Sequence, residues 1–237
     1  MEILKGKSFS APKLLIYGGA GSGKSTLASK LSKPLFLDFE GGLGNLDVYH
    51  SPVYTDLDVF YKDLADLYHK AEGGKREFDT IVIDSVDWLV RKTVEKAAGI
   101  NPQKLDETLN KSNGGYGNGK QVLENHIRSK LLPALVMLNK KGYGICLIAH
   151  ADRKDLMDAE GVDIARIAPK IDINTMNVFV EWVDNVFYLK KANGKRTLVL
   201  EENDNILAKN RLGLTGEVDL DGLDINKLLI PKEEEGE

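Results

Sequence analysis

The residues with the most recognisable chemistry lie near the start of the chain, in the glycine-rich run Gly18–Thr26. This run meets the pattern G-x-x-x-x-G-K-[ST] in full, with Lys24 and Ser25 at its end. Glycine lets the backbone turn so that successive N–H groups converge, and such a concave set of amides binds phosphate oxygens. The pattern therefore predicts a phosphate-binding loop, or P-loop. Its expected phosphate contacts are Gly18, Gly19, Ala20, Gly21, Ser22, Gly23, Lys24, Ser25 and Thr26.

The polar side chains of this loop have distinct expected roles. Lys24 would reach the β- and γ-phosphates of a triphosphate, the Ser25 hydroxyl would ligate Mg²⁺, and Thr26 would contact the α-phosphate. A short apolar segment precedes the loop and a helix is expected to follow, which is the context that the motif requires. Because the guanine-reading motif N-K-x-D is missing, we expect the nucleotide to be ATP, with Mg²⁺ as its ion.

A second candidate ligand is the carboxylate that ends the apolar run Thr80–Asp84. A run that is apolar throughout is typical of a parallel strand covered on both faces. In a P-loop protein an aspartate in this position emerges beside the Ser25 hydroxyl and holds Mg²⁺ through water. The alternative is that Asp84 caps a helix that starts at Val86, although Ser85 could do so equally well. The predicted metal ligands are Ser25 and Asp84.

Hydrolysis would also need a base that orients a water molecule towards the γ-phosphate. The strand Leu35–Phe39 leads to two acids on the same side of the pleat, Asp38 and Glu40. Glu40 is the better candidate because strand ends face the ligand crevice in parallel sheets, whereas Asp38 lies one pleat deeper. The alternative is that both are ordinary polar residues at a strand end.

The strand Tyr143–Ala149 ends in His150, a polar residue after an apolar run. Such a residue can report the presence of the γ-phosphate to the loop that follows, although a lone histidine is more often structural. Cys146 lies inside the strand and is expected in the core. As the chain's single cysteine it allows no internal disulfide, and four scattered histidines make a structural zinc site improbable.

Short apolar runs alternate with helical segments, which predicts an α/β fold with parallel strands joined by crossover helices. We expect a mostly parallel, twisted sheet flanked by helices, with an antiparallel C-terminal edge. Strands are predicted at Lys13–Tyr17, Leu35–Phe39, Thr80–Asp84, Tyr143–Ala149, Val186–Lys190, Thr197–Glu201 and Ile206–Lys209. Helices are predicted within Gly23–Lys30 and at Asp56–Ala71, Val86–Ala98, Lys120–Lys141 (kinked at Pro133) and Thr175–Asp184. Asn101–Gly119 and Ala151–Ile173 are predicted to be loops.

Composition and charge limit the class of protein. The net charge of −4 resides in residues 221–237, so the rest of the chain is balanced and has no DNA-coating basic surface. We expect one domain over residues 1–220 and an acidic, flexible tail over residues 221–237. No apolar run approaches the length of a membrane span, and the N-terminus lacks a signal-peptide core. A cytoplasmic protein without membrane contact is expected.

Together these segments resemble the RecA-like ATPases, and in particular phage-encoded nucleotide-binding proteins related to minimal RecA-core single-strand annealing ATPases. The resemblance covers about residues 13–213 and is strongest in the P-loop, Leu37–Glu40, Ile81–Ser85 and Leu147–His150. It implies that Glu40 is the catalytic glutamate and that His150 occupies the γ-phosphate sensor position, where RecA-like proteins often carry glutamine. It also implies that the His150 strand lies between the P-loop strand and the Asp84 strand. A phage-encoded protein of this kind would be located in the cytoplasm of the host cell.

A further segment, Ile206–Gly213, resembles hexameric helicases of the DnaB type. That resemblance implies that Lys209 and Arg211 stabilise γ-phosphate charge in a neighbouring subunit. It therefore also implies a homo-oligomer, either a ring or a filament, whose active sites are completed in trans. Lys190 and Lys191 are rivals for this role. The alternative is that Lys209 and Arg211 are solvated residues.

Binding of single-stranded DNA is implied mainly by the resemblance. The segment 151–173, at the position of a DNA-binding loop, has six acids against four bases and no aromatic stacking platform. The leading hypothesis is an ATPase that acts on single-stranded DNA in phage recombination or replication. The alternatives are a nucleotide-dependent assembly switch without DNA binding and a small-molecule kinase of the nucleoside type. Such kinases usually carry an arginine-rich lid, and no arginine cluster is present.

Overall fold

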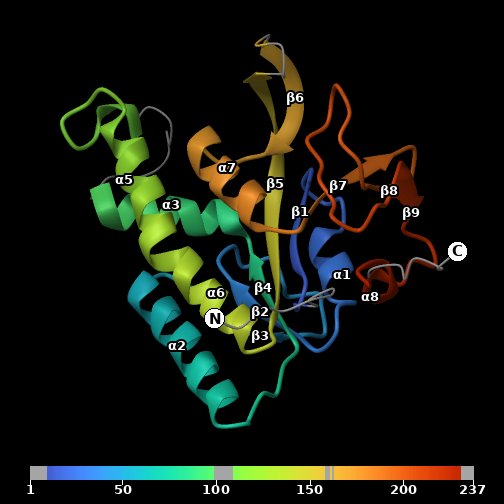
Figure 1. The fold of residues 1–237 in the computed structure, drawn as a ribbon, viewed down its shortest axis with the longest axis horizontal. Helices are drawn as coiled ribbons and strands as arrows, with labels where there is room; N and C mark the ends of the chain where they lie inside the picture. The colour runs from blue at the N-terminus through green and yellow to red at the C-terminus, as the bar shows by residue number, and fades with distance from the viewer. Residues whose placement is uncertain (1–9, 99–108, 158–160, 162, 231–237) are drawn as a thin grey trace, which may run out of the picture.

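The computed structural model of this protein describes residues 10–98, 109–157, 161 and 163–230. Within them a nine-stranded sheet is flanked by helices (Figure 1). The strands are β1 (Lys13–Gly18), β2 (Pro34–Asp38), β3 (Tyr49–His50), β4 (Thr80–Asp84), β5 (Gly144–Met157), β6 (Asp163–Pro169), β7 (Asn185–Ala192), β8 (Lys195–Val199) and β9 (Glu217–Asp219). The helices are α1 (Lys24–Ala28), α2 (Leu57–Glu72), α3 (Val86–Ala98), α5 (Asn118–His126), η2 (Ile127–Leu131), α6 (Leu132–Lys140), α7 (Ile173–Trp182) and α8 (Ile225–Leu228).

The order of the strands decides which residues meet at the edge of the sheet. The order is β3-β2-β4-β5-β1-β7-β8-β9, with β6 paired to β5 away from this path. Every pairing from β3 to β7 is parallel, and β8 and β9 add antiparallel strands at the C-terminal edge. The predicted α/β fold is confirmed. So is the expected position of the His150 strand, because β5 lies between β1 and β4.

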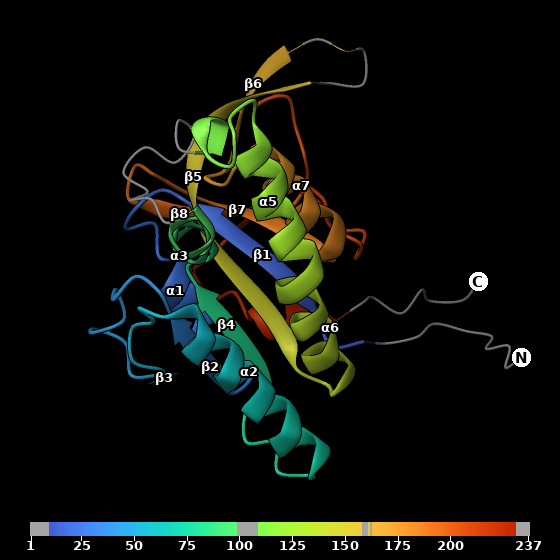
Figure 2. The same ribbon diagram turned by 90° about the vertical axis from the view of Figure 1, so that its left-hand side faces the viewer.

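Each face of the sheet packs against its own layer of helices. Ile81 and Ile83 face a core built with α2, α3, α5, α6 and α7, whereas Val82 faces a second core built with α1 and α8. Figures 1 and 2 show these two layers on opposite sides of the strands. All five residues of β4 are buried, which explains why the strand carries no polar alternation. Cys146 is buried in the second core, as predicted.

The long helix expected over Lys120–Lys141 is divided into three consecutive helical segments. It begins earlier, at Asn118, inside the segment that was expected to be a loop. A π-helical turn, η2, precedes Pro133, which lies in the first turn of α6. Proline has no N–H to donate to the preceding turn, and the wider π turn accommodates that missing hydrogen bond.

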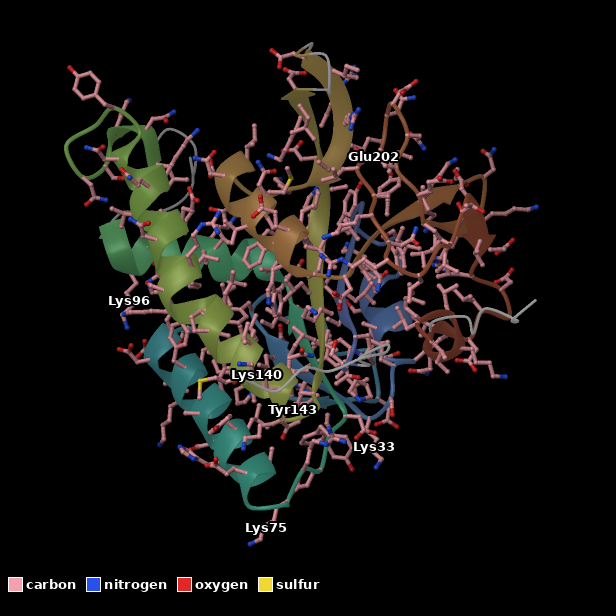
Figure 3. All side chains as sticks on the ribbon, viewed as in Figure 1. Lys33, Lys75, Lys96, Lys140, Tyr143 and Glu202 are labelled. Carbon is pink, nitrogen blue, oxygen red and sulfur yellow. The ribbon has the colours of Figure 1, made fainter. Side chains whose placement is uncertain are left out.

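The prediction of a loop over Ala151–Ile173 is wrong for most of its length. Strand β5 continues to Met157, and β6 returns antiparallel to it, so the two form a ribbon that projects from the body of the protein (Figures 1 and 2). Much of the ribbon is exposed or half-buried, so its residues lack the apolar periodicity that identifies a strand in the sequence. Glu202, labelled in Figure 3, forms an ion pair with Arg166 of the ribbon.

Two segments near the C-terminus also differ from expectation. The strand predicted at Ile206–Lys209 is reduced to isolated bridges, among them Val186 to Lys209, because Asn203 turns the chain there. Helix α8 falls in the region expected to be a flexible tail, yet Ile225 is fully buried and the Asp224 side chain caps the helix. Residues 231–237 lie outside the described residues. Among the residues that the structure describes, no helix has both the length and the apolar character needed to cross a membrane.

Candidate active site

The glycine-rich loop connects the buried strand β1 to the short helix α1. Gly21 and Gly23 have positive φ angles of 66° and 102°, a backbone conformation that favours glycine. Gly18 is required for a different reason, since a Cβ atom there would lie 2.5 Å from the carbonyl oxygen of Leu189 in the neighbouring β7. The side-chain oxygen of Ser22 is buried and has no hydrogen-bond partner among the described residues. The loop therefore has the shape and the unpaired polar group expected of a site that binds an anion.

Lys24 folds back over the loop that precedes it. Its Nζ donates to the carbonyl oxygens of Gly18 at 3.2 Å and of Gly19 at 3.1 Å. Burial lowers the pKa of Lys24, and the nearby carboxylates of Asp84, Glu40 and Asp87 act in the opposite direction. The ammonium group thus lies between the loop and an acidic cluster.

The two predicted metal ligands are in direct contact. Ser25 Oγ donates to Asp84 Oδ2 at 2.5 Å, although Asp84 comes from β4, two strands away from β1. Burial raises the pKa of Asp84 to about 6, with Glu40 and Asp38 adding to the effect and the Ser25 hydrogen bond opposing it. A hydroxyl and a carboxylate oxygen are hard donors that fit Mg²⁺.

The described residues contain no group of three or more histidine, cysteine, aspartate or glutamate side chains that could hold a metal by itself. Mg²⁺ rarely needs such a cage, because it keeps several waters and binds through one or two protein oxygens together with substrate phosphates. Ser25 and Asp84 are therefore a sufficient protein contribution to a magnesium site that a bound nucleotide would complete.

Replacing Asp84 with asparagine is expected to stabilise the nucleotide-free protein at about pH 7.5, where urea unfolding can measure the gain. The pKa of Asp84 rises from 3.8 to about 6 on folding, so the folded state holds the proton more tightly than the unfolded chain. The ionised carboxylate therefore costs stability above about pH 6, and this cost is lost as the pH falls. The gain, about 1–3 kcal/mol, should shrink at about pH 4.5, and an equal gain at both pH values would contradict this account.

The expected base and the expected sensor face each other across the mouth of the site. His150 Nε2 lies 3.5 Å from Glu40 Oε1. The other ring nitrogen, Nδ1, lies 2.9 Å from Asp87 Oδ2, and the backbone N–H of His150 donates to Asp87 Oδ1 at 3.2 Å. The hydrogen bond from Asp87 raises the pKa of His150 and outweighs its partial burial. The histidine ring is thus fixed on one side by Asp87 and directed on the other towards Glu40.

Asp38 has a structural role in this arrangement. Its Oδ1 accepts hydrogen bonds from the backbone N–H groups of Glu40 at 2.9 Å and Gly41 at 2.8 Å. Asp38 is buried, whereas Glu40 is exposed at the end of the strand. The Asp38 side chain therefore forms the turn that presents Glu40 to the site.

Asp87 is a site residue that the sequence analysis missed. It lies in the first turn of α3, where it is 4% exposed, and its neighbours on that helix, including Val86, Leu89 and Val90, belong to the core. Burial alone would raise the pKa of Asp87, but its hydrogen bonds with His150 lower it. One signal in the sequence could have identified Asp87: it is an acid on the buried side of a predicted helix, three residues after Asp84. A buried charge needs a partner, so such an acid indicates a contact with another polar group.

Lys209 and Arg211 lie away from the P-loop of their own chain and differ in environment. Lys209 Nζ donates to the carbonyl oxygens of Val180 at 2.7 Å, Glu181 at 3.3 Å and Val183 at 2.9 Å, at the C-terminal end of α7. The structure therefore gives Lys209 a helix-capping contact within its own chain. Arg211 is exposed, with Nη1 3.4 Å from Asp184 Oδ1.

The two rivals for that role are also accounted for. Lys190 Nζ lies 3.5 Å from Glu217 Oε1, in a pair between β7 and β9. Lys191 is exposed on β7. Of the four basic side chains considered for a role in trans, Arg211 is the one that combines high exposure with a single long contact.

A P-loop between β1 and α1, carboxylates at the ends of β2 and β4, and a polar residue in β5 between β4 and β1 define a RecA-like P-loop protein. Residues 10–212 match the family described as an AAA domain, so the chain belongs to that family. The resemblance predicted from the sequence is thereby confirmed.

Two individual proteins illustrate the relationship. The SPbeta prophage-derived uncharacterized protein YorG of Bacillus subtilis (strain 168) is 26% identical over 215 residues, which cover 86% of this chain and 61% of that protein. The chain thus spans about three fifths of that relative's length. The crystal structure of the RadB recombinase superposes with a TM-score of 0.50 and 17% identity, covering 87% of this chain and 86% of the other. This likeness concerns the fold.

Proposed function

We propose that the protein binds ATP with Mg²⁺ at Gly18–Thr26, hydrolyses it, and acts on single-stranded DNA in phage recombination or replication. The observation that supports the proposal most is the 2.5 Å contact between Ser25 Oγ and Asp84 Oδ2 beside a complete P-loop. It joins residues 59 positions apart in the sequence at the point where a P-loop protein holds its metal ion.

The residues of this chain would divide the work as follows. The loop amides and Lys24 would hold the phosphates. Ser25 and Asp84 would hold Mg²⁺, which would supply positive charge to the phosphate oxygens. Glu40 orients a water molecule and accepts its proton. Asp87 keeps the ring of His150 in place, so that Nε2 stays directed at Glu40 and the mouth of the site.

A role on DNA is supported by the two similar proteins, one named as prophage-derived and one as a recombinase, and by the ribbon of β5 and β6. The ribbon is tied to the site at both strands. His150 belongs to β5, and the hydroxyl of Tyr17, just before the P-loop, donates to the Ile167 carbonyl of β6 at 2.9 Å. Nucleotide state and ribbon position would therefore be coupled. Because the ribbon carries both acids and bases, we expect weak, salt-sensitive DNA binding.

The test is ATP turnover measured with and without single-stranded DNA, with double-stranded DNA as the control. Stimulation by the single strand supports the proposal. An ATP turnover rate that is the same with and without DNA, together with a change of oligomeric state on ATP binding, would instead favour the nucleotide-dependent assembly switch. No turnover with a folded, ATP-binding sample would overturn the hydrolytic part of the proposal.

We also propose a homo-oligomer, a ring or a filament, in which Arg211 acts in the active site of a neighbouring subunit. The variants Lys209→Ala and Arg211→Ala should distinguish the structural role of Lys209 from the role of Arg211 in turnover. Removing Lys209 leaves three carbonyls without their donor and should lower the free energy of unfolding by about 1–3 kcal/mol. Arg211→Ala should change stability by less than about 0.5 kcal/mol, since the side chain is exposed. It should lower turnover of the assembled protein at least about tenfold. Urea unfolding and turnover at high protein concentration measure these effects, and wild-type turnover by Arg211→Ala would remove its role in trans.

A further inference from the structure

A hairpin at the edge of the sheet brings another cation to the P-loop. Strands β7 and β8 are joined by Asn193-Gly194, whose φ angles of 50° and 77° are those of a tight hairpin turn. Strand β7 pairs directly with β1, with Leu189 opposite Gly18. The hairpin therefore lies beside the start of the P-loop, although Leu189 and Gly18 are 171 positions apart in the sequence.

Arg196 of β8 reaches across to the other end of that loop. A Cβ atom at Gly23 would lie 3.4 Å from Arg196 Nε, 3.5 Å from its Cδ and 3.9 Å from its Cζ. Gly23 directly precedes Lys24, so the guanidinium group rests on the rim of the predicted phosphate site. In the part of the chain that the structure describes, the Arg196 side chain makes no hydrogen bond or ion pair.

Among the described residues the Arg196 side chain has no partner, which distinguishes it from three of the basic residues considered for the site. Lys24 is bound to loop carbonyls, Lys190 pairs with Glu217, and Lys209 caps α7. Arginine presents five donors in a planar fork that matches phosphate oxygens, and such charge-assisted hydrogen bonds are the stronger kind. The Arg196 guanidinium group is exposed, lies beside the phosphate loop and has no acidic partner in the part of the chain that the structure describes, so its donors are available to a bound phosphate.

We propose that Arg196 binds the phosphates of the nucleotide within its own subunit, entering the site from the β7–β8 hairpin. The inference rests on the proposed function, because it requires a nucleotide in the loop. It adds a second cation from the same chain to Lys24. Phosphate binding would then be complete in a monomer, and a neighbouring subunit would be needed for turnover alone.

The experiment compares Arg196→Ala with Lys195→Ala in calorimetric titrations with ATP and with inorganic tripolyphosphate, both with Mg²⁺. Lys195 is the matched control, because it is the adjacent residue of β8, is exposed, carries the same charge and points to the opposite face of the strand. Arg196→Ala should weaken both ligands about tenfold, Arg196→Lys should recover part of the loss, and Lys195→Ala should stay within about twofold of the wild type.

Each other outcome has a clear meaning. Unchanged ATP affinity in Arg196→Ala, or an equal loss in Lys195→Ala, would overturn the proposal. A loss for ATP with none for tripolyphosphate would place the contact on the base or ribose and would also overturn it. Lys24→Ala in the same titrations tests the nucleotide site itself, so a wild-type affinity there would show that the proposed function fails, whatever Arg196 does.

Discussion

Replacing Lys24 with alanine is expected to weaken ATP binding by at least about a hundredfold. The side chain supplies the buried ammonium group of the site, held by the carbonyls of Gly18 and Gly19. Three carboxylates, those of Asp84, Glu40 and Asp87, are close enough to act on its pKa. Without the ammonium group, these carboxylates would repel the triphosphate, and only the loop amides and the metal ion would offset that repulsion. Calorimetric titration with Mg²⁺ and ATP measures the loss.

The matched control is Lys75→Ala. Lys75 is an exposed lysine in the turn after α2, and Figure 3 shows it at the end of the molecule opposite the ribbon. Its loss changes the net charge by the same amount and should leave the affinity within about twofold, because exposed charges at that distance are screened by salt. Stabilisation of the fold by ATP offers a second measurement, since a ligand that binds only the folded state raises the unfolding temperature. A folded Lys24→Ala variant with wild-type affinity would remove the P-loop from the mechanism.

The parts of the site that could be predicted are those whose chemistry is local. The P-loop is a contiguous motif, and Thr80–Asp84 identifies a buried strand by composition alone. The resemblance to RecA-like proteins then placed the His150 strand between the two, which the strand order confirms. The meeting of Ser25 with Asp84 follows from that order, because the parallel strands β4, β5 and β1 end at the same edge of the sheet.

The remaining features depend on contacts between distant segments. No local pattern around Lys209 indicates that its ammonium group meets the last carbonyls of α7, 26 to 29 residues earlier. Asp87 could be recognised as unusual but not assigned to His150, 63 residues away. The β5–β6 ribbon was missed because a two-stranded projection buries too little surface to impose an apolar period on its sequence. Sequence reasoning therefore predicted the phosphate loop together with Asp84, Glu40 and His150, and it missed Asp87, the contacts of Lys209 and the ribbon.

The arrangement of Glu40, His150 and Asp87 bears on why a histidine stands where the resemblance to RecA-like proteins predicts a γ-phosphate sensor. Asp87 binds both the backbone N–H and the ring of His150, so the side chain is fixed at two points before it reaches Glu40. A glutamine in the same place could accept or donate a hydrogen bond but could not carry a positive charge. A histidine whose pKa is raised by Asp87 can do so, and its charge then lies between two carboxylates.

The variant Glu40→Gln is expected to bind ATP and to hydrolyse it at least about a hundredfold more slowly, because general base catalysis contributes a factor of about 10² to 10⁴. Glutamine keeps the shape of the side chain and can still meet His150 Nε2, but it cannot accept the proton of the attacking water. Removing a negative charge near Lys24 also leaves the phosphates with less repulsion, so ATP affinity should stay the same or increase. Single-turnover hydrolysis and calorimetric titration on the same sample separate the two effects.

Glu77→Gln provides the control for this experiment, since Glu77 is an exposed glutamate in the segment before β4, at the opposite end of that strand from Asp84. It should turn over ATP at the wild-type rate. If Glu40→Gln does so as well, Glu40 is not the base. The buried Asp38 is already engaged in the turn, because its Oδ1 accepts the backbone N–H groups of Glu40 and Gly41. Weak binding together with slow turnover would point to a role for Glu40 in holding the nucleotide, because a residue that acts only on the water lowers the rate without lowering affinity.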